Sequence, residues 1–399
     1  MKILIVSRWL WEERRRNGDR PGFFGELFHE LAAKGVDVWI LSQAAGAGPV
    51  PERHPVDGLN VHIFSRNVRR PSMWALDKII KPWSGSRKAA SDAKVIRRFV
   101  RQHGPFDAIM AQCEEPDGLS CALASLAGGM PPLLTQVHDL RYQFTRGQVR
   151  FVRQSSLRFV FRQSARITAN SEQTAKWLRE EYHVPGRKIG PCRIHLTAPF
   201  LAEAAQNRAH EKPAGLRVLF LGALNEKKAP DIFLRAAIEL APELPDATFV
   251  VVGGETSEDF HFRARVGELA ARPQLAGRLE MTGRLEYTAV IDQIRRARVV
   301  VCPSRIETFS RTTIEAIALG RPVIVTETTG AAQWVGQSGA VIKANDERAL
   351  AEAIRAWARR DDTPDASTRI VNELTAARAA DDLLREIKLA IAPVPEAKR

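Results

Sequence analysis

The chain has 399 residues, of which 45% are hydrophobic and 26% charged, a composition that suits a folded protein with two full-sized domains. Its four cysteines are scattered without a CxxC pair, so we expect neither a disulfide framework nor a zinc site, and a reducing compartment fits. No stretch approaches 18 uninterrupted apolar residues, and the first apolar run is too short for a signal peptide. We therefore expect a cytoplasmic protein without a membrane span.

The formal net charge of +13 is unevenly distributed along the chain. Residues 1–200 hold 31 Lys and Arg against 18 Asp and Glu, whereas residues 201–399 hold 28 of each kind. The whole excess therefore lies in the first half. Such asymmetry indicates an anionic partner for that half, which could be an acidic lipid, a phosphorylated acceptor or a nucleic acid.

Short apolar runs alternate with helical patterns in both halves. The runs are rich in β-branched residues and nearly continuous, which is typical of strands buried on both faces of a parallel sheet. We expect strands at 2–7, 36–41, 107–111, 133–137 and 166–169, and a second series at 217–222, 248–253, 279–282, 299–303 and 322–325. Helical patterns at 24–33, 172–182, 231–239 and 347–358 lie between them. This alternation predicts α/β domains with parallel sheets.

The boundary between the domains is expected where apolar periodicity stops. Residues 200–215 are rich in Ala and polar residues and are interpreted as a linker. We thus predict a first domain at 1–199 and a second at 216–366. The segment 367–399 has helical composition and is expected to pack back on the first domain.

Two stretches of the first half are strongly basic. Residues 66–101 hold eleven Lys and Arg with only Asp77 and Asp92 as acids, and residues 141–166 hold seven Arg and no acid. Aromatic and aliphatic residues stand among these charges. This mixture suits the headgroup boundary of an anionic bilayer, although a solvated helical face with core aromatics would look the same.

The segment Pro303–Ile324 carries the most chemical information. A strand is expected to end near Pro303, and a helix to run from about Arg311 to Gly320. Free backbone amides and the helix dipole make such a helix start an anion site, so a diphosphate would lie against the segment Phe309–Thr313, that is against Phe309, Ser310, Arg311, Thr312 and Thr313. Glu307 could reach the hydroxyls of a sugar beyond the phosphate, and Glu315 could accept two hydrogen bonds from a ribose diol. Alternatively, an acid here only complements the helix dipole.

Glu307 and Glu315 form an E-x7-E motif that is followed by Ala-Ile-Ala-Leu-Gly-Arg-Pro-Val-Ile. This pattern resembles the signature of the GT-B retaining glycosyltransferases of family 4, the group-1 glycosyltransferases. The resemblance implies two Rossmann-like domains facing across a cleft and a UDP-, GDP- or ADP-sugar donor. It also implies that Glu307 contacts the donor sugar and Glu315 the nucleotide ribose.

Further segments agree with the family in the expected order. Residues 219–230 resemble the strand and turn that open the donor domain, with Gly222 and Lys228 matching. The resemblance implies that Lys228 neutralises the β-phosphate, a task for a compact cation. Ala223 stands where the family usually has Arg, so one phosphate-binding cation is missing. Ala229 stands where the family usually has Gly.

Two other turns resemble donor-binding segments. Met281-Thr-Gly-Arg-Leu resembles the turn whose backbone recognises the base, which implicates Arg284 and Leu285; an ordinary tight turn is the alternative. In the segment 329–333, Gln333 replaces the family's usual acid.

In the first half, Gly22 matches the family's N-terminal glycine loop, where glycine lets the backbone approach a phosphate or sugar. A simple helix cap is the alternative. His138, in Thr135-Gln-Val-His-Asp-Leu, resembles the strand-end histidine that lies near the reacting carbon, although a lone histidine can also be structural.

Together these features predict a metal-independent, retaining hexosyltransferase with no cofactor beyond its nucleotide-sugar co-substrate; no Asp-x-Asp metal motif stands out. Its acceptor would be a lipid-linked or anionic glycan of envelope or exopolysaccharide biosynthesis, used at the inner face of an anionic membrane. The alternatives are a nucleotide-sugar epimerase on the same scaffold and a non-catalytic glycan-binding relative. A nucleic-acid-binding protein is disfavoured, because the paired acids have no use there and no recognition helix or zinc finger is evident.

Overall fold

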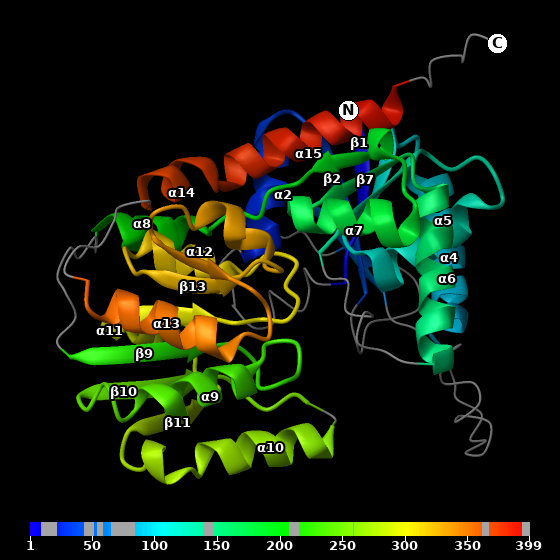
Figure 1. The fold of residues 1–399 in the computed structure, drawn as a ribbon. Helices are drawn as coiled ribbons and strands as arrows, with labels where there is room; N and C mark the ends of the chain where they lie inside the picture. The colour runs from blue at the N-terminus through cyan, green and yellow to red at the C-terminus, as the bar shows by residue number, and fades with distance from the viewer. Residues whose placement is uncertain are drawn as a thin grey trace. The chain divides into compact units, whose positions relative to one another are not determined.

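The computed structural model describes residues 1–8, 22–43, 52–53, 59–64, 84–138, 147–206, 215–257, 259–360 and 367–392. The chain divides into two compact units, residues 1–197 with 375–399 and residues 198–374 (Figure 1). Each unit contains a largely parallel sheet with helices on both faces. The predicted class of two Rossmann-like α/β domains is confirmed.

The sheet of the first unit has the strand order β3-β4-β2-β1-β5-β6-β7-β8, in which β3 alone is antiparallel to its neighbour. All five strands expected in this half are present. The bounds are β1 (Lys2–Val6), β2 (Asp37–Gln43), β3 (Glu52–Arg53), β4 (Asn60–Phe64), β5 (Ala108–Ala111), β6 (Leu133–Val137), β7 (Arg166–Ala169) and β8 (Ile189–Pro191). The strand β4 was not predicted because Asn60 and His62 interrupt its apolar run. His62 is nevertheless buried, stacked on Trp39 at 5.4 Å between ring centroids.

Two layers of helices cover this first sheet. Side chains of α2 (Phe23–Ala33) and α15 (Ala376–Ile391) share a core with alternate residues of β1, β2 and β4. The helices α4 (Ser84–His103), α5 (Leu119–Ser125) and α6 (Gly147–Gln163) pack side by side in that order. The unit also contains α7 (Glu172–Tyr182), a π-helical turn at Glu114–Gly118 and a 3₁₀ turn at Gly186–Lys188.

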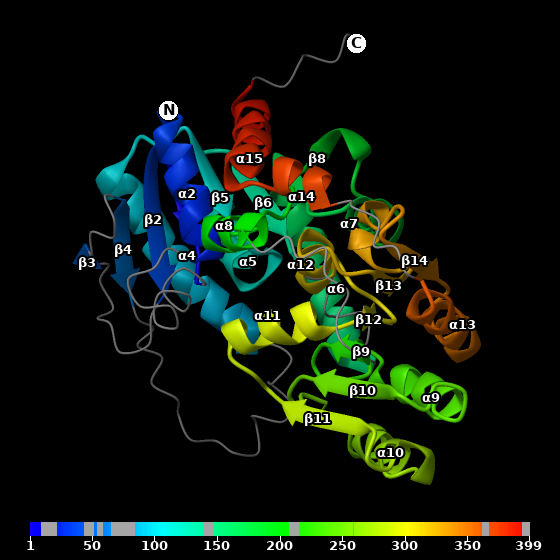
Figure 2. The same ribbon diagram turned by 90° about the vertical axis from the view of Figure 1, so that its left-hand side faces the viewer.

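The sheet of the second unit is fully parallel, with the strand order β11-β10-β9-β12-β13-β14. Its strands are β9 (Leu216–Leu221), β10 (Ala247–Val252), β11 (Leu279–Gly283), β12 (Val299–Cys302), β13 (Val323–Thr326) and β14 (Gly339–Ile342). The helices are α8 (Ala198–Gln206), α9 (Pro230–Leu240), α10 (Phe260–Ala270), α11 (Tyr287–Arg296), α12 (Arg311–Ala318), α13 (Glu347–Ala358) and α14 (Ser367–Glu373), with 3₁₀ turns at Pro273–Leu275 and Gly330–Trp334. Figure 2 shows α9 and α10 on one side of β9, β10 and β11, with α11 on the other.

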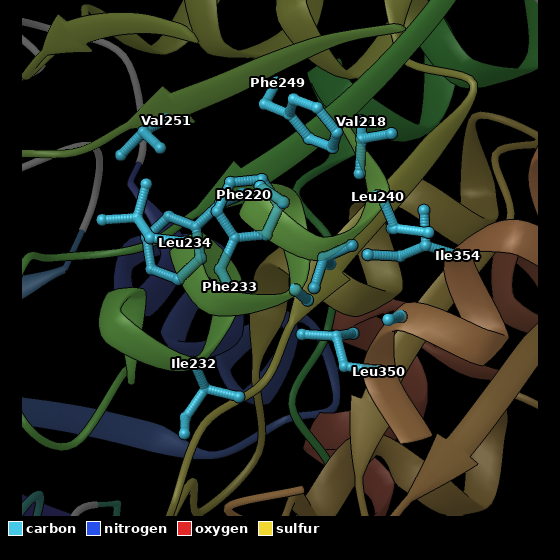
Figure 3. Packing of buried hydrophobic residues seen from close by; sticks show 14 of the residues in the cluster. Val218, Phe220, Ile232, Phe233, Leu234, Leu240, Phe249, Val251, Leu350 and Ile354 are labelled. Carbon is cyan, nitrogen blue, oxygen red and sulfur yellow. The ribbon is translucent and has the colours of Figure 1, made fainter. Parts of the chain in front are cut away.

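The core between this sheet and α9, α10 and α13 is apolar and closely packed. Figure 3 shows Phe220 and Phe249 of the strands facing Phe233 of α9 and Leu350 of α13. All four side chains are buried, and burying each contributes about 1.5–3 kcal/mol to folding. This core holds the ends of the strands in fixed positions.

The unit boundaries differ from the predicted ones at both ends of the second unit. The expected linker 200–215 begins inside α8, which belongs to the second unit and is tied to α11 by the Glu203–Arg295 ion pair at 2.7 Å. The expected C-terminal helix is two helices. Of these, α14 packs on α12 in the second unit, and α15 packs on α2 in the first.

Ion pairs with buried carboxylates fix α15 to β7 and to the segment after β8. Arg166 of β7 donates from Nε to Glu386 at 2.8 Å, and Arg193 donates from Nε to Asp382 at 2.6 Å. Both carboxylates are almost completely buried. The neighbouring Asp381 also pairs, with Lys34 at 2.7 Å, but its side chain is 56% exposed.

We expect Glu386→Ala to lower the free energy of unfolding of the first unit by about 3–5 kcal/mol, because it leaves the partly buried Arg166 guanidinium without its counter-charge. Asp381→Ala, the matched control on the same helix, should cost less than about 1 kcal/mol, because its pair is exposed. Urea unfolding of the two variants measures both values. Equal losses would show that burial of the pair does not anchor α15.

Candidate functional site

Two loops meet where the strand order of the second sheet reverses. The strands β9 and β12 are neighbours, but the chain leaves them toward opposite edges of the sheet. Such a switch point opens a crevice at the carboxyl ends of parallel strands, where ligands bind in open α/β sheets. The loop after β9 carries Lys228 and the loop after β12 carries Glu307. The Lys228 ammonium donates to Glu307 Oε2 across the switch point, and both side chains are largely buried.

The turn after β9 sets the position of Lys228. Its backbone amide donates to Asn225 Oδ1 at 3.0 Å, and the aliphatic stem lies against Gly222, where an added Cβ would stand 3.5 Å from it. Ala229 follows with a left-handed φ of 55°, a conformation that costs a residue other than glycine about 1–2 kcal/mol. Its buried methyl group in the core offsets part of that cost.

The loop after β12 is held at both ends. Arg305 forms a bidentate ion pair with Asp231, at 3.0 and 2.7 Å, and its backbone amide donates to the Lys227 carbonyl at 2.9 Å. Glu307 pairs with Thr329 as an isolated β-bridge. The two loops therefore hold each other, and Lys228 and Glu307 meet as parts of one connected structure.

The helix α12 begins directly after this loop. Ser310 has a left-handed φ of 78°, and its hydroxyl accepts from the Thr313 amide at 3.4 Å. The amide of Thr313 is thus used for capping, and the amides of Ser310, Arg311 and Thr312 precede it at the positive end of the helix dipole. Phe309 is buried and its carbonyl accepts from the Ala331 amide at 2.7 Å, which fixes the helix start.

The cysteine below this helix start shows how close these groups lie. Burial raises the pKa of the Cys302 thiol, while the nearby Lys228 ammonium and hydrogen bonds with Thr313 and Ser310 act against that rise. The end of β12 therefore lies under both the ion pair and the start of α12.

Glu315 lies one turn into α12 and is buried. Its Oε1 accepts from the Tyr287 hydroxyl at 3.0 Å and from the Arg311 guanidinium at 3.3 Å. Burial and the charge of Glu315 raise the pKa of Tyr287 well above its ordinary value, so this phenol stays a donor. Tyr287 was not predicted from the sequence. The only available signal was its place two residues after the Arg284–Leu285 turn.

The base-binding turn predicted at Arg284 and Leu285 follows β11. Arg284 is exposed and Leu285 half-buried. The ends of β10 and β11 lie close together at Gly254. A Cβ atom added to Gly254 would stand 3.6 Å from the Cβ of Arg284. Gly253, with φ of 153°, leaves no room for a side chain, since an added Cβ would stand 1.8 Å from the Gly222 carbonyl oxygen.

The two candidates in the first unit lie near Phe24 of α2. His138 follows β6, its ring centroid is 5.6 Å from that of Phe24, and its carbonyl accepts from Asn170 Nδ2 at 3.2 Å. Gly22 is the N-cap of α2 with φ of −84°, which any residue can adopt. Its carbonyl accepts from the Glu26 amide at 3.0 Å. The local backbone thus matches the alternative of a helix cap.

A further histidine of the first unit matches no motif of the family but lies close to α2, the helix that also contacts His138. His195 is fully buried and stacks on Phe23 at 4.1 Å between ring centroids, with its Nε2 4.0 Å from Glu26 Oε2. The sequence assigned it no role, because the Asn-Gly that the family usually has in this segment is absent here, and the contact with Phe23 joins residues far apart in the chain.

Sequence reasoning also missed the polar groups at the switch point of the first sheet, between β1 and β5. Ser7 donates to Gln112, and the Arg8 amide donates to Asp117 at 3.4 Å. Burial raises the pKa of Asp117 to about 6. The one signal was the run Glu114–Asp117 directly after a predicted strand.

Part of the predicted basic stretches lies outside the described residues, namely 66–83 and 141–146. The remainder forms α4, α6 and the first residue of β7, Arg166. Among the residues that the structure describes, no helix is long and apolar enough to span a membrane. Within the same residues, no three His, Cys, Asp or Glu side chains are grouped as metal ligands.

Two family profiles match most of the chain. Residues 215–360 match the profile of group 1 glycosyl transferases, and residues 23–190 match that of glycosyltransferase family 4. A D-inositol 3-phosphate glycosyltransferase of Rhodococcus erythropolis is 27% identical over 335 residues, which cover 79% of this chain and 72% of the relative.

Solved structures share the fold over almost the whole chain. HepE of Anabaena, in complex with UDP and glucose, aligns with a TM-score of 0.65 at 17% identity over 97% of this chain and 99% of its own. A structure described as trehalose-6-phosphate from Escherichia coli bound with UDP-2-fluoro glucose aligns with a TM-score of 0.72 at 11% identity. The alignment covers 97% of this chain and 99% of the other. The predicted GT-B fold class is confirmed.

We expect Gly253→Ala to destabilise the second unit by about 3 kcal/mol or more, because the methyl group would overlap the Gly222 carbonyl and the backbone conformation disfavours a side chain. Gly254→Ala, the adjacent control, should cost only about 1 kcal/mol, because its added carbon meets ordinary contact distances. Urea unfolding measures both. Equal stability of the two variants would contradict the close approach of the strand ends.

Proposed function

The chain belongs to the family 4, or group-1, glycosyltransferases, and from this premise we propose that it transfers a hexosyl group from a nucleotide-sugar to an acceptor hydroxyl with retention at the anomeric carbon. One observation carries the proposal: Lys228 and Glu307 meet across the switch point of the second sheet, beside the start of α12. A cation, a carboxylate and the first-turn amides of a helix at one point are the groups that a sugar diphosphate requires.

The donor would lie along the carboxyl ends of the strands. Its diphosphate would accept hydrogen bonds from the amides of Ser310, Arg311 and Thr312, which carry the positive end of the helix dipole. The sugar would extend to Glu307, and the ribose diol would bind Glu315. The base would lie at Arg284 and Leu285, which stand beside the Gly253–Gly254 turn. The UDP complexes of structures with this fold support a UDP-sugar over GDP- and ADP-sugars.

Donor binding would exchange one set of partners for another. Without donor, Lys228 and Glu307 neutralise each other, and Glu315 is satisfied by Tyr287 and Arg311. A diphosphate offers Lys228 two negative charges in place of one. Glu307 is then released to accept hydrogen bonds from sugar hydroxyls, so each buried charge keeps a partner throughout.

The chemistry follows from where charge develops. The bond from the anomeric carbon to the phosphate oxygen breaks, and its electron pair passes to the phosphate. The acceptor oxygen bonds to the same face of the carbon, and its proton goes to the departing phosphate. Lys228 and the α12 amides stabilise the growing phosphate charge, the role that a metal ion takes elsewhere, so we propose that the reaction needs no metal.

For the acceptor we propose a lipid-linked or phosphorylated molecule of envelope or exopolysaccharide synthesis, used on the cytoplasmic side of a membrane. The net positive charge of residues 1–200 supports an anionic acceptor, as does the inositol phosphate in the name of the Rhodococcus relative. His138 and Gly22 are proposed to serve the reaction from the first domain.

We expect Lys228→Met to reduce transfer by about a hundredfold or more and to abolish thermal stabilisation by the donor, because the leaving phosphate loses its cation. Lys227→Met is the matched control. Wild-type protein at a donor concentration of a hundred times Kd should gain about 2.7 kcal/mol of stability.

The measurement is a thermal-shift series with UDP-, GDP- and ADP-sugars, followed by product analysis with and without acceptor. Equal donor stabilisation in both lysine variants would overturn the assigned pocket. Conversion of the donor to an epimer without acceptor would replace transfer by epimerisation.

We expect Tyr287→Phe to raise the donor KM about fivefold with little change in kcat, because the hydroxyl orients Glu315 for ribose binding alone. The same substitution should have much less effect on a 2′-deoxyribose donor, which offers Glu315 only one hydroxyl. Steady-state kinetics with both donors give the comparison. An equal penalty on both would show that Tyr287 acts only on the fold.

A further inference from the structure

A row of positive charge runs along one exposed face of α4 in the first unit. Lys94, Arg97, Arg98 and Arg101 follow the spacing i, i+3, i+4 and i+7, which places them on one face of a helix. Lys94, Arg98 and Arg101 are exposed and Arg97 is half-buried. We call these four residues the α4 stripe.

The opposite face of α4 fixes the direction in which the stripe points. Ala89, Ala93, Ile96, Phe99 and Val100 are all buried, and the helix packs along α5 (Figure 1). The helix cannot rotate without exposing Ile96 and Phe99. The stripe is therefore held outward by the core of the domain.

The stripe lacks counter-charges among the residues that the structure describes. Asp92, the one acid within α4, is buried on the other side of the helix. None of the four basic side chains forms an ion pair within the described part of the chain. Surface arginines elsewhere do: Arg217 meets Glu280 at 2.7 Å and Arg355 meets Glu243 at 2.7 Å.

The four side chains also border a common space. With Gln102 they line an open hollow of about 570 Å³. At a rise of about 1.5 Å per residue, the stripe extends roughly 10 Å along the helix axis. A row of guanidinium groups over that length can bind phosphate groups by paired hydrogen bonds.

A second basic helix of the same unit adds further exposed positive charge. The helix α6 contains no acid, and its Arg150, Arg158 and Arg162 are exposed. Phe151 is 71% exposed, and an exposed aromatic beside basic residues is typical of segments that enter the headgroup boundary.

We propose that the α4 stripe docks the protein on the anionic headgroup surface of a lipid bilayer. The inference rests on the proposed function, because a lipid-linked acceptor is reached at such a surface. An outward row of charge without an ion pair among the described residues complements a plane of phosphates, and Lys and Arg near an anionic leaflet each strengthen binding severalfold. The proposed membrane contact thus consists of four residues of one helix.

The test uses the full chain and two variants of equal charge. The first replaces the stripe: Lys94→Gln, Arg97→Gln, Arg98→Gln and Arg101→Gln. The control replaces one lysine and three arginines that are exposed in the second unit: Arg235→Gln, Arg272→Gln, Lys343→Gln and Arg348→Gln. Both lose four positive charges. Sedimentation with vesicles containing about one third phosphatidylglycerol in phosphatidylcholine measures binding, at low and high salt.

We expect the stripe variant to bind these vesicles on the order of a hundredfold more weakly than wild type, and the control variant within a fewfold. Wild-type binding should fall at high salt and be absent on pure phosphatidylcholine. An equal loss in both variants, or none in the stripe variant, overturns the proposal. So does loss of vesicle binding in millimolar inorganic phosphate at matched ionic strength, because the stripe then holds a free anion.

Donor-induced thermal stabilisation separates this result from the proposed function. The stripe variant should keep the full shift with UDP-sugar, which also shows that it is folded. Absence of any donor shift in the wild type would reject the donor site and leave the vesicle result unaffected.

Discussion

The ion pair between Lys228 and Glu307 is the interaction on which the site depends. It joins two loops that leave neighbouring strands in opposite directions, at the point where a parallel sheet opens a crevice. The pair keeps both charges satisfied in a largely buried place, and each charge is the type that one part of a sugar diphosphate needs. A lysine and a glutamate that neutralise each other can each exchange partners when a donor binds, so neither charge is left without a partner.

The surrounding residues hold the two side chains of this pair in position. Arg305 joins the two loops through Asp231 and the Lys227 carbonyl, and Gly253 lets the neighbouring strand end approach Gly222 directly. Ser310 caps α12 so that its first amides face outward from the helix end. These contacts lie at the rigid ends of strands, so the side chains that bind the nucleotide-sugar are positioned before it binds. Little conformational entropy is then lost on binding.

Much of this could be predicted from the sequence because the relevant signals are local. Continuous apolar runs mark strands buried on both faces, and Glu307 and Glu315 stand at fixed distances from a helix start. The rest depends on contacts between distant residues. Tyr287 of α11 reaches Glu315 of the next helix, α12, His195 is buried against Phe23, and His62 is accommodated in a strand because Trp39 stacks on it. The helix α8 was taken for linker because its short, Ala-rich sequence shows little periodicity.

A crystal structure of the protein with a UDP-sugar, or with a non-transferable analogue, tests the central claim most directly. The account predicts that Lys228 Nζ leaves Glu307 and lies about 3 Å from an oxygen of the β-phosphate, while Glu307 accepts from the sugar hydroxyls. A diphosphate bound away from the start of α12, with the ion pair intact, would contradict it.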